Sequence, residues 1–70
     1  MRENLKAERK LSNNTQEEVA ASLGITARQY RAIEAGASDG SMKVWQKLKR
    51  LFGKPIDYLT EKTVFKKGRD

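Results

Sequence analysis

Apolar residues recur along this chain at the three- and four-residue spacing of amphipathic helices, and no stretch alternates as a strand would. The spacing predicts five helices joined by short polar or glycine-containing segments. They are expected at residues 2–11, 15–23, 26–35 and 42–52, followed by a short fifth helix with Pro55 in its first turn. The pattern therefore predicts an all-α fold.

The apolar stripes of these helices indicate the core. The residues expected to point inward are Leu5, Leu11, Val19, Ala20, Leu23, Tyr30, Ile33, Val44, Trp45, Leu48, Leu51, Phe52, Ile56 and Leu59. Trp45 falls on such a stripe, so we assign it to the core and not to an interaction surface. Tyr30 is also expected in the core, with its hydroxyl group at the edge.

Two capping boxes mark helix starts in the middle of the chain. In TQEE, Thr15 is expected to cap the second helix while Glu18 bonds back to it. In TARQ, Thr26 and Gln29 take the same roles for the third helix. Gly24, between them, suits the left-handed position at which a helix ends. The two helices are thus predicted to meet at a corner too tight for a flexible linker.

This corner meets the demands that a helix-turn-helix makes on sequence. Ala20 supplies a small residue where two backbones approach, and Gly24 tolerates a positive φ. The apolar residues at the offsets that fill the wedge are Val19, Leu23, Ile25, Tyr30 and Ile33. These positions together predict a helix-turn-helix.

The segments LKAERK and TQEEVAASLGITARQYRAIEAG resemble the lambda-repressor-like domain of Cro/repressor (Xre-type) regulators of bacteria and phages. The resemblance runs from Leu5 to Leu59. It rests on the arginine of the first helix, the Thr-Gln that opens the second, the alanine and glycine of the turn, and the Glu-x-Gly that closes the third. It implies a compact five-helix DNA-binding domain whose third helix enters the major groove. We expect this domain at residues 1–60, followed by a basic tail, 61–70, that is partly ordered or dimer-associated.

A third helix in the major groove would meet bases through its outward residues. Base contacts are expected from Ala27, Arg28, Gln29 and Arg31. Arginine pairs bidentately with guanine, glutamine pairs with adenine, and alanine can contact a thymine methyl group. Arg28 is the first candidate, whereas Arg31 is expected to reach a base or a phosphate. The short side chain of Ala32 weakens the case for a contact there, and the alternative is that all these residues simply face solvent.

Phosphate contacts are expected at three further positions. Gln16 stands at the N-terminus of the second helix, where free N–H groups and the helix dipole favour an anion, and the resemblance implies a DNA-backbone contact for it. Lys43 and, less strongly, Asn14 are the other candidates. The loop GASDGS carries Asp39 and no cation, so we expect a modest affinity for DNA.

The resemblance also implies a structural ion pair. Arg9 and Glu34 occupy the positions that form a partly buried pair in similar domains and tie the first helix to the end of the third. Removing one partner of a buried pair typically costs about 3–5 kcal/mol. We therefore expect these two residues to serve stability and not base recognition.

The net charge of +6 is concentrated late in the chain. Between residues 43 and 54 there are five cations and no acid: Lys43, Lys47, Lys49, Arg50 and Lys54. Such a stretch suits a polyanionic partner, but a solvated helix face is the alternative, and we favour it for Lys47, Arg50 and Lys54.

Composition removes several classes of function. The chain has no cysteine and no histidine, so it lacks the usual residues of nucleophilic and general-base catalysis and of zinc binding. We expect no enzymatic activity, no metal and no cofactor. No apolar run approaches the length of a membrane span or a signal-peptide core, so we expect a cytoplasmic protein of a bacterial nucleoid or phage-infected host, without a membrane partner.

The function expected from these observations is sequence-specific regulation of transcription, most simply repression, by a homodimer on a palindromic double-stranded DNA operator. Candidates for the dimer surface are Ile56, Tyr58, Leu59, Val64 and Phe65. The alternative is a protein-interaction module on the same fold, such as an antirepressor or antitoxin-like partner. A further C-terminal domain in a longer parent chain also stays open.

Overall fold

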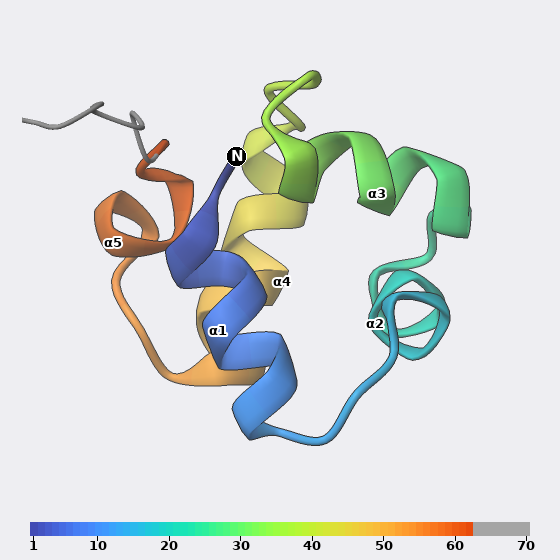
Figure 1. Ribbon diagram of the computed structural model, residues 1–70, viewed down its shortest axis with the longest axis horizontal. Helices are drawn as coiled ribbons and strands as arrows, with labels where there is room; N and C mark the ends of the chain where they lie inside the picture. The colour runs from blue at the N-terminus through green and yellow to red at the C-terminus, as the bar shows by residue number, and fades with distance from the viewer. Residues whose placement is uncertain (63–70) are drawn as a thin grey trace, which may run out of the picture.

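The computed structural model describes residues 1–62 and shows five α-helices and, within those residues, no strand (Figure 1). The helices are α1 (Glu3–Leu11), α2 (Gln16–Leu23), α3 (Ala27–Ala35), α4 (Met42–Phe52) and α5 (Ile56–Thr60). The predicted all-α fold and the predicted helix positions are confirmed. None of these helices has the length and apolarity needed to cross a lipid bilayer.

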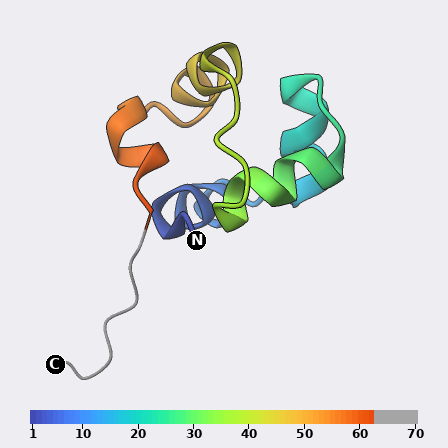
Figure 2. The same ribbon diagram turned by 90° about the horizontal axis from the view of Figure 1, so that it is seen from above.

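The helices surround one small core. In both views α1 and α4 lie in the middle, α2 and α3 form a corner on one side, and α5 lies on the other (Figures 1 and 2). The buried apolar residues are Leu5, Val19, Ala20, Leu23, Tyr30, Ile33, Trp45, Leu48 and Leu59. Every helix contributes to this set, so the corner is fixed to the rest of the molecule by shared burial. The predicted core position of Trp45 is confirmed.

Two residues expected in the core lie at the surface instead. Leu11 is 78% exposed and Leu51 is 43% exposed. Leu11 follows Leu5 by six positions. At about 100° per residue this offset places Leu11 roughly a third of a turn away from the inward face. The inward face of α1 continues through Glu8 and Arg9, whose side chains are each only 11% exposed. These two polar residues take the place on that face expected for Leu11.

The residue before α1 is a buried cation that the helical pattern did not reveal. Arg2 is 3% exposed and lies outside the helix that was expected to contain it. Its guanidinium donates to the carbonyl oxygens of Ile33 and, at 2.8 Å, Ser38, and its Nε donates to that of Thr60 at 3.1 Å. The guanidinium also lies 5.1 Å from the ring centroid of Trp45. Arg2 thus joins the end of α3, the loop after it and the end of α5.

Candidate nucleic-acid interface

The α2–α3 corner is fixed by its own hydrogen bonds. Both predicted capping boxes are present: the Thr15 hydroxyl accepts from the Glu18 N–H at 3.1 Å, and the Thr26 hydroxyl accepts from the Gln29 N–H at 3.0 Å. Gly24 ends α2 in the left-handed conformation, with φ of 75°. Because helix ends and turn are satisfied locally, α3 is held at a defined angle to α2.

The outward face of α3 carries two arginines in different states. Arg31 lies 3.6 Å from the carboxylate of Glu17, with both side chains mostly exposed. Arg28 is exposed and forms no ion pair within residues 1–62. Ala27 is half-buried at the first position of the helix. Arg28 is therefore the arginine on this face whose guanidinium is available to a ligand without breaking an existing pair.

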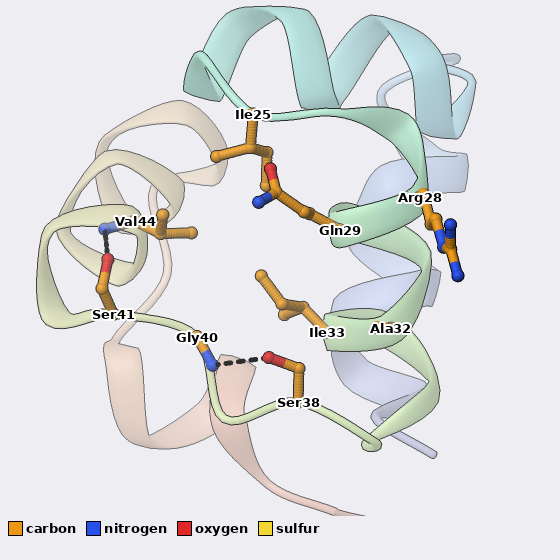
Figure 3. Close-up of a pocket in the computed structure, with 9 residues that line it drawn as sticks. All are labelled: Ile25, Arg28, Gln29, Ala32, Ile33, Ser38, Gly40, Ser41 and Val44. Carbon is orange, nitrogen blue, oxygen red and sulfur yellow. Dashed lines mark hydrogen bonds between the residues drawn. The ribbon is translucent and has the colours of Figure 1, made fainter.

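The side chain of Gln29, which was expected to pair with adenine, caps the start of α3. Its side-chain oxygen accepts from the Thr26 N–H at 2.9 Å, as the capping box requires. Figure 3 shows its side chain extending toward Ile25, whereas Arg28 points to the opposite side of α3. A bidentate contact to adenine also uses the amide oxygen, which would accept through its second lone pair while the first holds the cap. The Nε2 group of Gln29 donates no hydrogen bond within residues 1–62 and is free to contact a ligand.

A buried carboxylate ties α3 to α1 and α2. Glu34 is 2% exposed, and its oxygens accept from Arg9 Nε at 2.8 Å and Arg9 Nη2 at 3.2 Å. They also accept from Gln16 Nε2 at 3.0 Å and from the Tyr30 hydroxyl at 2.8 Å. The Tyr30 hydroxyl is thus buried and not at the edge of the core, because Glu34 supplies the acceptor that a buried phenol needs.

These hydrogen bonds decide the charge state of the cluster. Burial alone would raise the pKa of the Glu34 carboxyl, but the hydrogen bonds from Arg9, Tyr30 and Gln16 outweigh it and hold the pKa below its ordinary value. The bond to Glu34 raises the pKa of Arg9. Burial, with the bond to Glu34, raises the pKa of Tyr30. The carboxylate therefore stays ionised while Arg9 and Tyr30 keep their protons.

The three residues expected at phosphates lie in α2, just before α2, and in α4. Gln16 opens α2 with its amide held by Glu34, and Asn14 lies just before α2 with its Nδ2 donating to Ser12 Oγ at 2.8 Å. Lys43 is exposed in the first turn of α4. In Figure 3 the beginning of α2 and the whole of α4 lie on opposite sides of α3. The candidates therefore flank α3 and do not form one cluster.

Comparisons with known proteins agree with this geometry. Residues 5–59 match a family of proteins described as helix-turn-helix. The chain belongs to this Cro/C1-type helix-turn-helix family. A protein of Methanocaldococcus jannaschii, named as an uncharacterized HTH-type transcriptional regulator, is 40% identical over 57 residues, which are 81% of this chain and 86% of that protein. No solved structure matches the chain. Family and relative together support a DNA-binding transcription regulator.

The expected dimer surface of this helix-turn-helix domain needs one correction. Leu59 is fully buried, because it packs into the core from α5, so it is not available to a partner. Ile56 and Tyr58 are half-buried, and the Tyr58 hydroxyl donates to Glu8 at 3.3 Å. Val64 and Phe65 lie outside the described residues. Of the candidates, only Ile56 and Tyr58 are seen to reach the surface.

Two cations of the basic stretch between residues 43 and 54 contact other parts of the domain. Lys47 donates to the carbonyl oxygen of Leu23 at 3.4 Å, at the end of α2. Lys54 lies 3.6 Å from the carboxylate of Glu8. The Lys47 contact joins α4 to the end of α2, and the Lys54 pair joins the segment after α4 to α1, which gives the two lysines a structural role. Lys49 and Arg50 are exposed on α4.

Proposed function

We propose that this chain is a sequence-specific transcription regulator of the repressor kind, which inserts α3 into the major groove of its operator. The observation that carries the proposal is the α2–α3 corner, closed by its caps, which presents an exposed and unpaired Arg28 on the outward face of α3. In helix-turn-helix proteins the second helix of the motif reads bases while the first crosses the DNA backbone. The arrangement supports the same division between α3 and α2.

The residues divide into two roles under this proposal. Arg28 pairs with a guanine, and Ala27 meets the base edge nearest the start of α3. Arg31 reaches a base or a phosphate once it leaves Glu17, an exchange that costs little because exposed ion pairs contribute about 0–1 kcal/mol. Gln16, Asn14 and Lys43 position the domain by phosphate contacts on either side of α3.

We further propose that the protein acts as a homodimer on a palindromic operator. One domain of this size contacts only a few base pairs through one helix, and two-fold pairing of half-sites one helical turn apart supplies the rest of the specificity. Ile56 and Tyr58, with Val64 and Phe65, are the candidates for the dimer contact. Repression would follow from occupation of a promoter.

The test is the affinity of Arg28→Ala for the duplex that the wild type enriches from a random library. A bidentate arginine–guanine contact is worth about 1–3 kcal/mol, so we expect a loss of about 5- to 150-fold with an unchanged melting temperature. Arg50→Ala is the matched control, since it removes an exposed arginine from α4 and should alter affinity little. Equal binding by Arg28→Ala and wild type would refute the proposed role of α3.

The cation-rich surface of α4 supports a second candidate function, a protein-interaction module on the same fold. Lys43, Lys49 and Arg50 are exposed there beside the half-exposed Leu51, with no acid between residues 43 and 54. An acidic protein segment would complement this surface. Failure of the wild type to enrich any duplex would favour this candidate.

A further inference from the structure

A hollow of about 430 Å³ lies between α3 and the beginning of α4 (Figure 3). We call it the α3–α4 hollow and define it by Ile25, Ala32, Ile33 and Val44, with Ser38 and Ser41 of the connecting segment at its rim. Two of the residues that line it, Ala32 and Gly40, have little or no side chain. A side chain at Gly40 would be strained, because φ is +70° and an added Cβ would lie 3.0 Å from Trp45 Nε1.

The two serine oxygens at the rim of the hollow each accept a hydrogen bond from a backbone N–H. Ser38 Oγ accepts from the Gly40 N–H at 3.3 Å, and Ser41 Oγ accepts from the Val44 N–H at 3.2 Å as the cap of α4. Arg28 also lines the hollow, but its guanidinium points away from the floor (Figure 3). The floor is formed by Ile25, Ile33 and Val44 and is apolar, so it suits an apolar group and not a phosphate.

The side chain of Gln29 places a free amide donor beside this apolar floor. Gln29 is fixed by its cap, which uses its side-chain oxygen, and its Nε2 donates no hydrogen bond within residues 1–62. In Figure 3 the Gln29 amide extends over the hollow toward Ile25. The combination is an amide donor next to an apolar space large enough for a methyl group.

This combination matches one base edge of the DNA major groove. Thymine presents the O4 acceptor next to the C5 methyl group, whereas adenine, guanine and cytosine carry no methyl group there. Ala32 lies one helical turn after Arg28, so the hollow borders the outward face of α3. We propose that the α3–α4 hollow receives the methyl group of one operator thymine while Gln29 Nε2 donates to the O4 atom of that thymine, an inference that rests on the proposed function.

In such a complex Ala32 and Gln29 have roles other than those expected from the sequence. The shortness of Ala32 is not a missing contact, because a longer side chain would fill the space that the methyl group needs. Gln29 keeps its cap and its donor at once, so it reads thymine without leaving the conformation in which it holds the start of α3. Specificity at this position would come mainly from shape.

The test removes one methyl group at a time from the enriched duplex by replacing each thymine with deoxyuridine. For the wild type we expect one thymine in each half-site at which this replacement weakens binding about fourfold, the effect of one buried methyl group. Ala32→Gln, which fills the hollow, should bind the thymine and deoxyuridine duplexes equally. Ala35→Gln, the same substitution at an exposed position of α3 outside the hollow, should keep the difference.

A second comparison separates the methyl group from the rest of the base. At the same position, 5-methylcytosine should bind about fourfold better than cytosine, since it restores the methyl group, yet worse than thymine, since an amino donor replaces O4. Melting temperatures of Ala32→Gln and Ala35→Gln establish that both variants fold.

The outcomes divide cleanly. A methyl effect that is abolished by Ala32→Gln and kept by Ala35→Gln supports the proposal. An enriched duplex in which no thymine responds to loss of its methyl group overturns it while leaving the proposed function intact, and so does a methyl effect that survives in Ala32→Gln. Failure of the wild type to enrich any duplex overturns both.

Discussion

Glu34 is the residue on which the most interactions of the helix-turn-helix converge. Its carboxylate accepts from Arg9, Gln16 and Tyr30, and so connects α1, the start of α2 and α3 in the core. Loss of the carboxylate would leave a buried arginine and a buried phenol without their acceptor.

We expect Glu34→Ala to lower the free energy of unfolding by about 3–5 kcal/mol, the usual cost of breaking a buried pair from one side. Urea unfolding measures it, with Glu34→Gln as a milder variant if the alanine form fails to fold. Glu17→Ala is the control, because it removes the surface partner of Arg31 and should cost less than about 1 kcal/mol. Similar losses for the two positions would contradict the role given to Glu34.

The lowered pKa of Glu34 also predicts a dependence of stability on pH. A carboxyl whose folded pKa lies below its unfolded value near 4.5 stabilises the fold fully above that value and loses this contribution as the pH falls through the folded pKa. The stability difference between wild type and Glu34→Gln should therefore be constant near neutral pH and shrink below about pH 4.5. Unfolding curves across this range measure it, and a difference that grows in acid would have the wrong sign.

Arg2 is the second buried charge, and its removal should be felt at a distance. Arg2→Ala leaves the carbonyl groups of Ser38 and Thr60 without their donor, and each unsatisfied buried group costs about 1–3 kcal/mol. The carbonyl of Ile33 keeps its bond from the Gly36 N–H. We expect lower stability, with faster amide hydrogen exchange at residues 36–41. Arg2→Lys keeps the charge but not the planar fork, so it should restore little. Full rescue by lysine would show that charge alone matters.

Residues differ in how far their roles could be predicted. The pairing of Arg9 with Glu34 followed from resemblance, and Tyr30 lies four residues before Glu34 on one predicted helix, a spacing that makes the two neighbours. Nothing in the sequence marks Gln16 as a further donor to Glu34. Arg2 precedes the first helix, where helical periodicity carries no information. Long-range side-chain contacts depend on the tertiary arrangement, and local patterns do not encode them.

At the scale of the elements, the α2–α3 corner depends on Gly24. Its φ of +75° lies in the left-handed region, and an added Cβ would meet nothing within 4 Å. Gly24→Ala should therefore cost only the conformational term, about 1–2 kcal/mol. Gly40→Ala should cost more, because the same strain is joined by a 3.0 Å approach to Trp45. Equal melting temperatures for the two variants would contradict this reading.

The elements were predicted well where their signals are local. Capping boxes, helix-ending glycines and apolar spacing all act within a few residues, and Thr15, Thr26 and Gly24 take the expected roles. The failures at Leu11 and Leu51 came from assuming that every leucine of a helix belongs to its inward stripe. Gln29 was assigned both a cap and a base contact, and the structure shows the cap, with its oxygen accepting from the Thr26 N–H, while the base contact stays a prediction.

At the scale of the whole molecule, the proposed operator complex contains two chains. Sedimentation equilibrium with a palindromic duplex should show two chains per duplex, and a duplex with one half-site should bind one chain more weakly. The reason is that each domain supplies one reading helix and the dimer joins two of them. One chain per palindrome at saturation would contradict the dimer.

The central claim is that α3 of this helix-turn-helix domain reads a specific DNA sequence. The most direct test is selection from a random duplex library at near-physiological salt, since low salt rewards phosphate contacts of any sequence. We expect a two-fold-symmetric motif for the wild type, with a guanine in each half-site whose enrichment disappears in Arg28→Ala. Recovery of no motif, or of the same guanine with Arg28→Ala, would contradict it.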